Sequence, residues 1–259
     1  MSRIRPVFIL VLLLLASHKL IAQNSPPATP RAELTTAPLL RFTGNVDSNS
    51  PAVWQRINGL NQMLVLTSTA GQPSLASGPQ LRRLSDPAPI VMNPWPGGGV
   101  WMEAVVADDD GTLYGYYHNE MGATMCRGDS STKVIPRIGA ARSRDRGATW
   151  EPLGLVLEAP PGTFDCRTNN VYFVGGVGDF SVRLDPDSRD LYFFYSQYIR
   201  FDRLQGVGVA RLAWADRDEP VGKATVWNAG AWLPATADPD RDIGWRYPKQ
   251  SIQYRGCYR

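Results

Sequence analysis

Three stretches of the sequence share one layout: SPAVWQRINGLNQMLVLTS (50–68), MEAVVADDDGTLYGYYH (102–118) and DFSVRLDPDSRDLYFFYS (179–196). In each, a short segment with β-branched or aromatic residues leads into an acidic or Asn-Gly turn, and a strongly apolar segment follows. This arrangement is typical of β-hairpins. From Arg41 onward, no long stretch has the 3.6-residue period of an amphipathic helix. The sequence therefore predicts an all-β fold.

Further strands follow two of these hairpins. Residues 136–159 (PRIGAARSRDRGATWEPLGLVLEA) predict a strand, a tight turn and a strand, and 205–215 and 223–232 predict two more strands. Each unit then holds about four antiparallel strands, which is the size of a β-propeller blade. Because the units recur in one internal order, a propeller is favoured over a sandwich with irregular hairpins. Three blades are visible between about Asn45 and Trp232.

The turn within 136–159 carries a sharp motif. Residues 143–150 (SRDRGATW) fit the pattern S-x-D-x-G-x-T-W, which is called an Asp box and is similar to the hairpins of sialidases and other sugar-processing propellers. We expect Ser143 and Asp145 to bond the turn backbone, Gly147 to take a positive φ, and Trp150 to pack beneath the turn. Such a hairpin lies on the outer face, so we give it a structural role and no catalytic one.

The N-terminus has the layout of a secretory signal peptide. Two arginines precede the apolar run VFILVLLLLA (7–16), and small residues end the segment at Ala22. The alternative is a membrane anchor, but the run is shorter than the ~20 residues that a spanning helix needs. We therefore predict a signal peptide at 1–22, a Pro-rich leader at 23–40, and a secreted or periplasmic protein without membrane attachment after cleavage.

Charge and layout exclude some functions for the remaining chain. The sequence holds 27 Lys+Arg and 24 Asp+Glu, and three of the basic residues lie in the predicted signal peptide. A neutral body without a basic cluster argues against nucleic-acid binding.

Blades are predicted over 41–232, and an irregular tail over 233–259. Since an open propeller leaves sheet edges unpaired, we predict an incomplete five-bladed propeller that is truncated or shifted in sequence near its C-terminus; the alternative is a small fold of another kind.

Each first strand has an acidic residue at or near its predicted start: Asp47, Glu103 and Asp179. The innermost strand of each blade lines the central channel, so these side chains are expected to converge. Glycoside cleavage needs two carboxyl groups, one as acid and one as base or nucleophile. Burial and mutual repulsion raise the pKa of one of them. We predict these three as catalytic residues, with Glu103 as the proton donor because apolar residues flank it.

Residues near these acids are candidates for sugar binding: Asn49, Trp54, Trp101, His118, Asn119 and Glu120. Tryptophan rings offer faces for sugar rings. His118 is the only histidine outside the predicted signal peptide, which argues against a metal site or a Ser-His-Asp triad. For His118 the alternative is a packed, hydrogen-bonded core residue. We expect neither a metal nor a cofactor.

Cysteine usage agrees with export. Cys126 follows the second strand of the middle blade and Cys166 precedes the first strand of the next, both in loops expected near the channel rim. We predict a disulfide between them. Cys257, in the predicted tail, is left over.

Together the leader, the Asp box, the acids and the blade repeats resemble the five-bladed propeller glycosidases, the arabinanase, xylosidase and invertase-like group, over about residues 42–232. The resemblance implies two aspartates and one glutamate in that order along the chain, whereas the order here is Asp47, Glu103, Asp179. The expected function is an exported, glycoside hydrolase-like propeller with a carbohydrate substrate. The alternatives are a non-catalytic propeller that binds a glycan or a protein, and an inactive truncated copy.

Overall fold

The structure is a computed structural model that describes Glu33, Thr36 and residues 46–128, 132–159, 162–187, 189–198, 205–228 and 230–235. The chain divides into two units, Met1–Leu39 and Leu40–Arg259, and all strands belong to the second. The predicted signal peptide (1–22), most of the leader (23–40) and the predicted tail beyond residue 235 lie outside the described residues. Within the described part, no helix is both long enough and apolar enough to cross a membrane.

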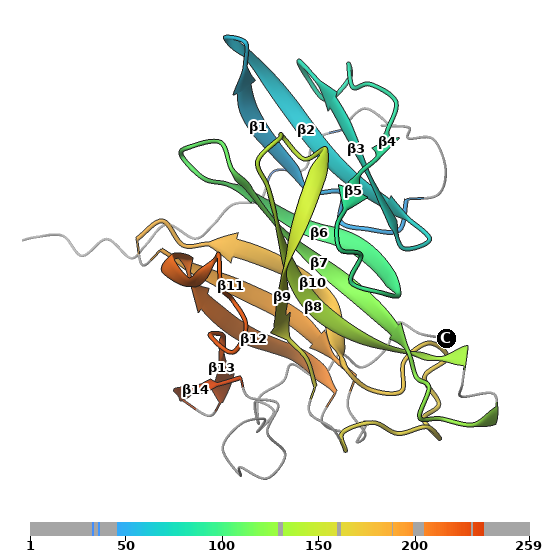
Figure 1. Cartoon of the computed structure of the whole chain (residues 1–259). Coiled ribbons are helices and arrows are strands. Elements are labelled where there is room, and N and C mark those ends of the chain that lie inside the picture. Colours follow the sequence, from blue (N-terminus) through green and yellow to red (C-terminus); the bar gives the residue numbers. More distant parts are fainter. Residues whose placement is uncertain are drawn as a thin grey trace, which may run out of the picture. The chain divides into compact units, whose positions relative to one another are not determined.

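The first sheet contains the hairpin predicted at 50–68 and two further strands (Figure 1). Its antiparallel order is β1-β2-β3-β4, formed by β1 (Ala52–Ile57), β2 (Leu60–Thr69), β3 (Gln72–Gly78) and β4 (Ala88–Pro89). Asn58 and Gly59 join β1 to β2 with φ values of 50° and 79°. Positive φ at both central residues is what a two-residue hairpin turn needs, so the Asn-Gly pair fixes this register.

The second sheet contains the predicted hairpin and the strand–turn–strand segment that follows it. Its strands are β6 (Gly99–Ala107), β7 (Leu113–Gly122), β8 (Val134–Ser143) and β9 (Thr149–Leu157), with β5 (Val91–Met92) at the edge. The order is β5-β9-β8-β7-β6. β5 pairs with β9 in parallel, which the sequence analysis did not predict. The segment that leaves the first sheet therefore covers the outer edge of the second.

The third sheet has the order β10-β11-β12-β13-β14. Its strands are β10 (Val177–Leu184), β11 (Asp190–Gln197), β12 (Gly206–Ala213), β13 (Thr225–Asn228) and β14 (Ala231–Pro234). A single 3₁₀ turn, η3 (Trp214–Asp216), follows β12. The segment predicted as one strand at 223–232 forms two short antiparallel strands, and β14 reaches two residues past the predicted blade boundary.

Two apolar cores hold the three sheets together. Leu66, Met102 and Tyr117 belong to the core that joins the first and second sheets, whereas Tyr116 and Phe193 belong to the core that joins the second and third. Tyr116 and Tyr117 are neighbours in β7 and point to opposite faces, as alternation along a strand requires. The middle sheet is thus buried on both faces, which explains the uninterrupted apolar character of β7. The all-β prediction is confirmed, and the sheets form successive blades of an incomplete β-propeller.

The hairpin between β8 and β9 has the contacts that the sequence led us to expect. Ser143 Oγ accepts the Gly147 N–H at 2.8 Å, and Asp145 accepts the N–H and the hydroxyl of Thr149 at 2.8 and 2.6 Å. Gly147 has a φ of 87°, and Trp150 is buried and donates to the Gly147 carbonyl. Burial acts to raise the pKa of Asp145, but hydrogen bonds from Thr149 and Ser143 outweigh it and lower the pKa. Hydrogen bonds within residues 143–150 thus hold the turn, and its Ala148 carbonyl also accepts the Val91 N–H of β5.

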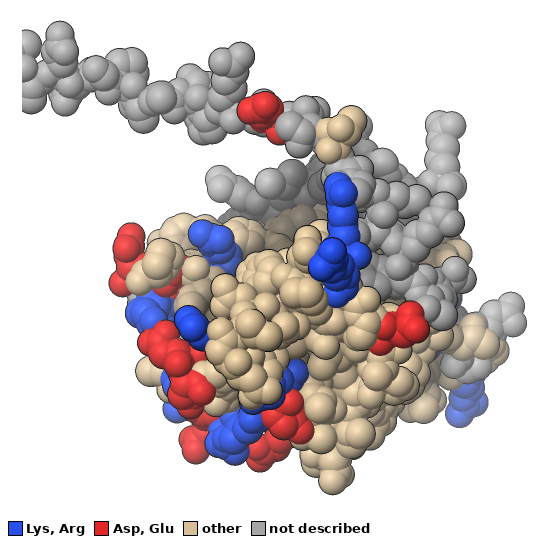
Figure 2. All heavy atoms as spheres, turned by 90° about the horizontal axis from the view of Figure 1, so that it is seen from above, with Lys and Arg blue, Asp and Glu red and all other residues tan. Residues whose placement is uncertain are grey.

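Charged residues are mixed in sign on the face shown in Figure 2. Acidic and basic side chains lie side by side along one margin of that face, and a broad area beside them is uncharged. Within the described part of the chain, Arg142 pairs with Asp218 and Glu151, and Arg217 pairs with Asp108. Mixed signs give this face no extended field of one sign.

Candidate functional site

One cleft of about 540 Å³ brings the three predicted acids together. The residues that line it are Asp47, Ser48, Asn49, Glu103, Asp179, Phe180, Ser181, Phe194 and Val207. They come from the segment before β1, from β6, and from β10, β11 and β12, so all three blades contribute. Convergence of side chains 132 residues apart in sequence follows from the repeat, since each blade presents its first strand to the same place.

Glu103 owes its position to a β-bulge rather than to the start of its strand. It is the fifth residue of β6, and the register with β7 shifts between Met102 and Ala104. Met102 is fully buried, and Ala104 is buried as well. A bulge adds one residue that opposes nothing on the partner strand and redirects its side chain. Glu103 therefore turns into the cleft between two neighbours that both point into cores.

Asp179 occupies a second bulge, in β10. The register with β11 shifts between Gly178 and Phe180, and Asp179 has a φ of 42°. That left-handed conformation costs a non-glycine residue about 1–2 kcal/mol. The carboxylate accepts a hydrogen bond from the Tyr198 hydroxyl. About half of the side chain stays exposed, at 53%.

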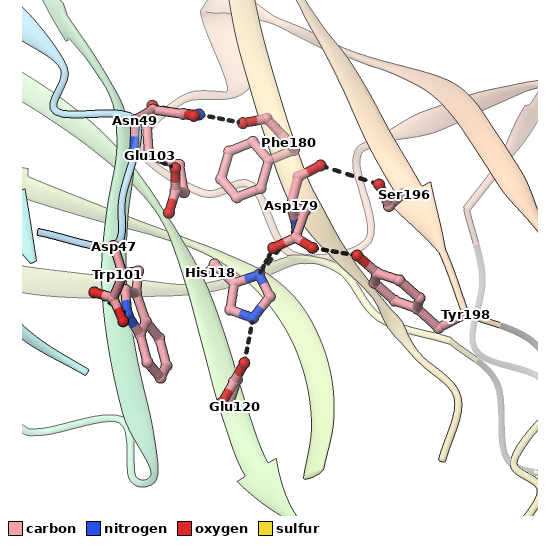
Figure 3. Close-up of polar contacts among 10 residues, drawn as sticks. All are labelled: Asp47, Asn49, Trp101, Glu103, His118, Glu120, Asp179, Phe180, Ser196 and Tyr198. Atoms are coloured by element: carbon pink, nitrogen blue, oxygen red, sulfur yellow. Dashed lines mark hydrogen bonds and ion pairs between the residues drawn. The ribbon is translucent and has the colours of Figure 1, made fainter. Parts of the chain in front are cut away.

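Asn49 ties the two bulges together. Its backbone N–H donates to Glu103 Oε2 at 2.9 Å, and its side-chain Nδ2 donates to the Phe180 carbonyl at 2.8 Å (Figure 3). Nδ2 also reaches the Glu103 carbonyl at 3.4 Å. Backbone oxygens next to a bulge lose regular ladder partners. One residue from the first blade thus satisfies such oxygens in the second and third.

Burial raises the pKa of Glu103 from the usual 4.5 to about 7. The N–H of Asn49 and the nearby His118 act to lower it, and the charges of Asp179 and Asp47 act to raise it further. Desolvation disfavours the charged form of a carboxyl group, and like charges do the same. Near neutral pH a substantial fraction of Glu103 therefore carries a proton.

Contacts with the first and second blades hold Asp47 at the cleft. Trp101 Nε1 donates to Asp47 Oδ1 at 3.0 Å, and the Asp47 N–H donates to the Ser68 carbonyl at 3.1 Å. The Trp101 ring meets His118 edge-on with centroids 5.6 Å apart. Trp101 therefore orients an acid, whereas the sequence analysis assigned it to the binding of a sugar ring.

The structure separates the other predicted binding residues. Asn119 is fully buried; its Nδ2 donates to the carbonyls of Gly97 and Gly99, and its Oδ1 accepts from Arg137. Trp54 is 52% exposed on β1 and is not among the residues that line the cleft. His118 and Glu120 contact each other behind the cleft, with Nε2 and Oε1 3.1 Å apart. Of the six, Asn49 alone lines it.

Sequence reasoning missed Tyr198 and the apolar wall of the cleft. Phe180, Phe194 and Val207 form that wall, and Phe194 is 44% exposed. Tyr198 directly follows β11, and its N–H donates to the carbonyl of Gly176, three residues before Asp179. The signal that could have found it is the hairpin register, because residues at the end of the second strand face those at the start of the first.

Cys126 and Cys166 form a disulfide in the structure, with Cα atoms 5.5 Å apart. Both cysteines lie in a small apolar cluster with Ala123, Ile135 and Val174, and neither is among the residues that line the cleft. Cys257 lies outside the described residues. Among the described residues, no group of three or more His, Cys, Asp or Glu side chains is arranged to hold a metal ion.

No protein-family model matches the chain, and no curated protein matches its sequence. Solved structures with a similar backbone include an endo-arabinase from Bacteroides thetaiotaomicron, with 16% identity, 71% of this chain and 59% of that chain covered, and a TM-score of 0.43. A thermostable family-43 glycoside hydrolase has 10% identity, coverages of 75% and 54%, and a TM-score of 0.44. The inulosucrase from Halalkalicoccus jeotgali, bound to kestose, has 15% identity, coverages of 79% and 57%, and a TM-score of 0.46. The chain spans little more than half the length of these structures. That it is an incomplete five-bladed propeller, truncated near its C-terminus, stays a prediction.

Proposed function

We propose that this protein is a glycoside hydrolase-like propeller that cleaves a glycosidic bond in the cleft of Asp47, Glu103 and Asp179. The observation that carries the proposal is the convergence of three carboxyl groups from three blades on one cleft. A cleft of about 540 Å³ has room for a small number of sugar units, and one of its walls is apolar.

Glu103 is the proton donor in this proposal. With a pKa of about 7 it still holds a proton near neutrality, and it gives that proton to the glycosidic oxygen as the bond to the anomeric carbon breaks. Asp179 acts on the opposite side, as the base that takes a proton from water or as the nucleophile. Its half-exposed carboxylate is accessible, and Tyr198 orients it. Asp47 is the third acid, and Trp101 fixes its direction.

Glu103→Gln and Asp179→Asn test the catalytic assignment. Each change keeps the shape of the side chain and removes its acid–base function, so we expect kcat to fall by ~10²–10⁴ on any glycoside that the parent hydrolyses. The measurement is turnover on a panel of aryl glycosides and oligosaccharides, with melting curves to show that the fold persists. Glu219→Gln, which changes an exposed acid outside the cleft, is the matched control.

The outcomes separate the alternatives. Parent-like turnover in both variants would remove the catalytic roles. If the parent binds a glycan without turnover and the variants lose that binding, the protein is a lectin-like propeller. If the parent neither binds nor cleaves any member of the panel, the inactive-copy alternative is favoured.

We also propose that the protein works outside the cytoplasm. Its support is the Cys126–Cys166 disulfide, because such bonds persist in oxidising compartments. Peptide mapping of exported, non-reduced protein should recover the two cysteines as one cross-linked pair. Recovery of both as free thiols would contradict the proposal.

A further inference from the structure

His118 is a buried titratable side chain to which the proposed chemistry gives no task. It lies on β7, and only 3% of its surface is exposed. Figure 3 shows it between Glu120 and Asp179, with Trp101 beside its ring. It does not line the cleft, so it is not positioned to contact a substrate directly.

The hydrogen bonds of the ring define its protonation. The Asp179 N–H donates to Nδ1 at 3.0 Å, and a backbone N–H can only donate, so Nδ1 is the acceptor of this bond. Nδ1 also lies 3.5 Å from Asp179 Oδ1. On the other side Nε2 lies 3.1 Å from Glu120 Oε1, and an ionised carboxylate can only accept. A ring that makes both bonds is the Nε2–H tautomer, with Nδ1 as the acceptor. Glu120 selects this tautomer, and the tautomer in turn supplies the acceptor for Asp179.

That acceptor is needed because of the bulge. Asp179 is the extra residue of β10, so it has no partner residue in the ladder, and its positive φ must be maintained by contacts outside the ladder. The bond from its N–H to His118 supplies one such contact. The approach is so close that a Cβ at Gly178 would come within 2.5 Å of His118 Cε1 and Nδ1. Gly178 thus leaves room for the His118 ring, and the next residue, Asp179, lines the cleft.

We propose that His118, oriented by Glu120, is a positioning residue that holds the Asp179 bulge so that the Asp179 carboxylate faces the cleft. This inference rests on the proposed function and deepens it, because it explains how one of the two bulge acids is held in a reactive geometry. His118 itself neither contacts the substrate nor transfers a proton to it.

Two amide substitutions at His118 distinguish the effect of losing the hydrogen-bond acceptor from the effect of losing the ring. In His118→Asn the side-chain oxygen can occupy the place of Nδ1 and still accept the Asp179 N–H. In His118→Gln the amide reaches the place of Nε2, and no acceptor remains near Asp179. A misplacement of about 1 Å can cost ~10²-fold in rate. We therefore expect the Gln variant to lose about 100-fold in kcat with KM within about threefold, and the Asn variant to retain most of its turnover.

The experiment uses the full chain and has two readouts. The first is kcat and KM on the best substrate of the parent, with melting temperatures for both variants. The second is the ¹⁵N–¹H resonance of the Asp179 amide, which should move strongly in the Gln variant and little in the Asn variant. This resonance reports the hydrogen bond whether or not the protein hydrolyses glycosides.

The two readouts distinguish the possible failures. Equal turnover in the two variants, or losses that follow only their melting temperatures, would overturn the positioning role. If the parent is inactive, the proposed hydrolase function fails, and the amide resonance decides this inference by itself: an unmoved resonance in His118→Gln would refute it.

Discussion

Glu103 and Asp179 occupy similar bulges in the first strands of neighbouring blades, but their surroundings differ. In both blades the bulge lies in the first strand, opposite Tyr116 and Tyr117 in one and opposite Tyr195 and Ser196 in the other, and the bulged residue lines the same cleft. Repetition of the blade therefore explains why the two acids meet. It does not explain why they differ.

The difference lies in what covers each carboxyl group. Glu103 sits beneath the segment before β1, where burial raises its pKa to about 7. Asp179 has 53% of its side chain exposed and accepts the hydroxyl of Tyr198. Two carboxyl groups with different environments can divide the roles of acid and base between them. The blade repeat therefore determines where the two carboxyl groups lie, and the contacts between blades determine how buried each one is and in which direction its pKa moves.

The largest expected effect is on the pH dependence of activity. If protonated Glu103 is the donor, kcat/KM should be level below its pKa of about 7 and fall about tenfold per pH unit above it. At pH 9 the loss relative to the plateau is then about 100-fold. Steady-state kinetics from pH 5 to pH 9, with stability checked at each pH, measure it. A kcat/KM that stays constant from pH 7 to pH 9 would contradict the assignment of Glu103 as the proton donor.

Much of the fold could be predicted from the sequence because hairpins leave local signals. The Asn58-Gly59 turn and the two-faced apolar strand β7 are examples in which neighbouring residues determine the outcome. The parallel pairing of β5 with β9 could not be predicted, because two residues carry no periodic pattern and their partner is more than fifty residues away. The bulges likewise depend on how two strands align, so Glu103 was expected at the start of a strand and lies within one.

The candidate site could be predicted as a set of acids, but not in its detail. His118, Asn119 and Glu120 were predicted to bind substrate together, although alternation along β7 sends Asn119 to the opposite face from the other two. His118 and Glu120 share a face and bond to each other, while Asn119 holds the carbonyls of Gly97 and Gly99. A stricter use of the two-residue period would have separated them. Tyr198 could have been found from the register of the β10–β11 hairpin, because it directly follows the strand that pairs with β10.

A second expected effect concerns stability. Because the folded-state pKa of Glu103 is raised, its contribution to stability is present below about pH 4.5 and is lost as pH rises through about 7. Glu103→Gln removes a carboxyl group that must ionise while buried, so the variant should gain stability relative to the parent above pH 7. We expect a gain of about 1–3 kcal/mol at pH 8 that vanishes near pH 4. Urea unfolding at both pH values measures it.

Glu151→Gln provides the control of opposite sign. Glu151 is exposed on β9, and the hydrogen bond and charge of Arg142 lower its pKa. Its contribution to stability is present above its unfolded-state pKa and is lost as pH falls, so this variant should show no gain at pH 8. A gain of similar size in both variants would mean that the effect is a general one of surface charge and not of Glu103.

The smallest expected effect is a shift in the alkaline limb of activity produced at Asn49. Asn49→Asp and Asn49→Ala both lose the Nδ2 bond to the Phe180 carbonyl, while the backbone N–H to Glu103 stays in both. Only the first variant adds a negative charge beside Glu103, and a like charge raises the pKa of a carboxyl group. We expect the limb in Asn49→Asp to move upward by about half to one pH unit relative to Asn49→Ala. A ¹³C titration of the Glu103 carboxyl should show the same shift without relying on turnover. Coincident limbs and titration curves in the two variants would show that the charge at position 49 does not reach Glu103.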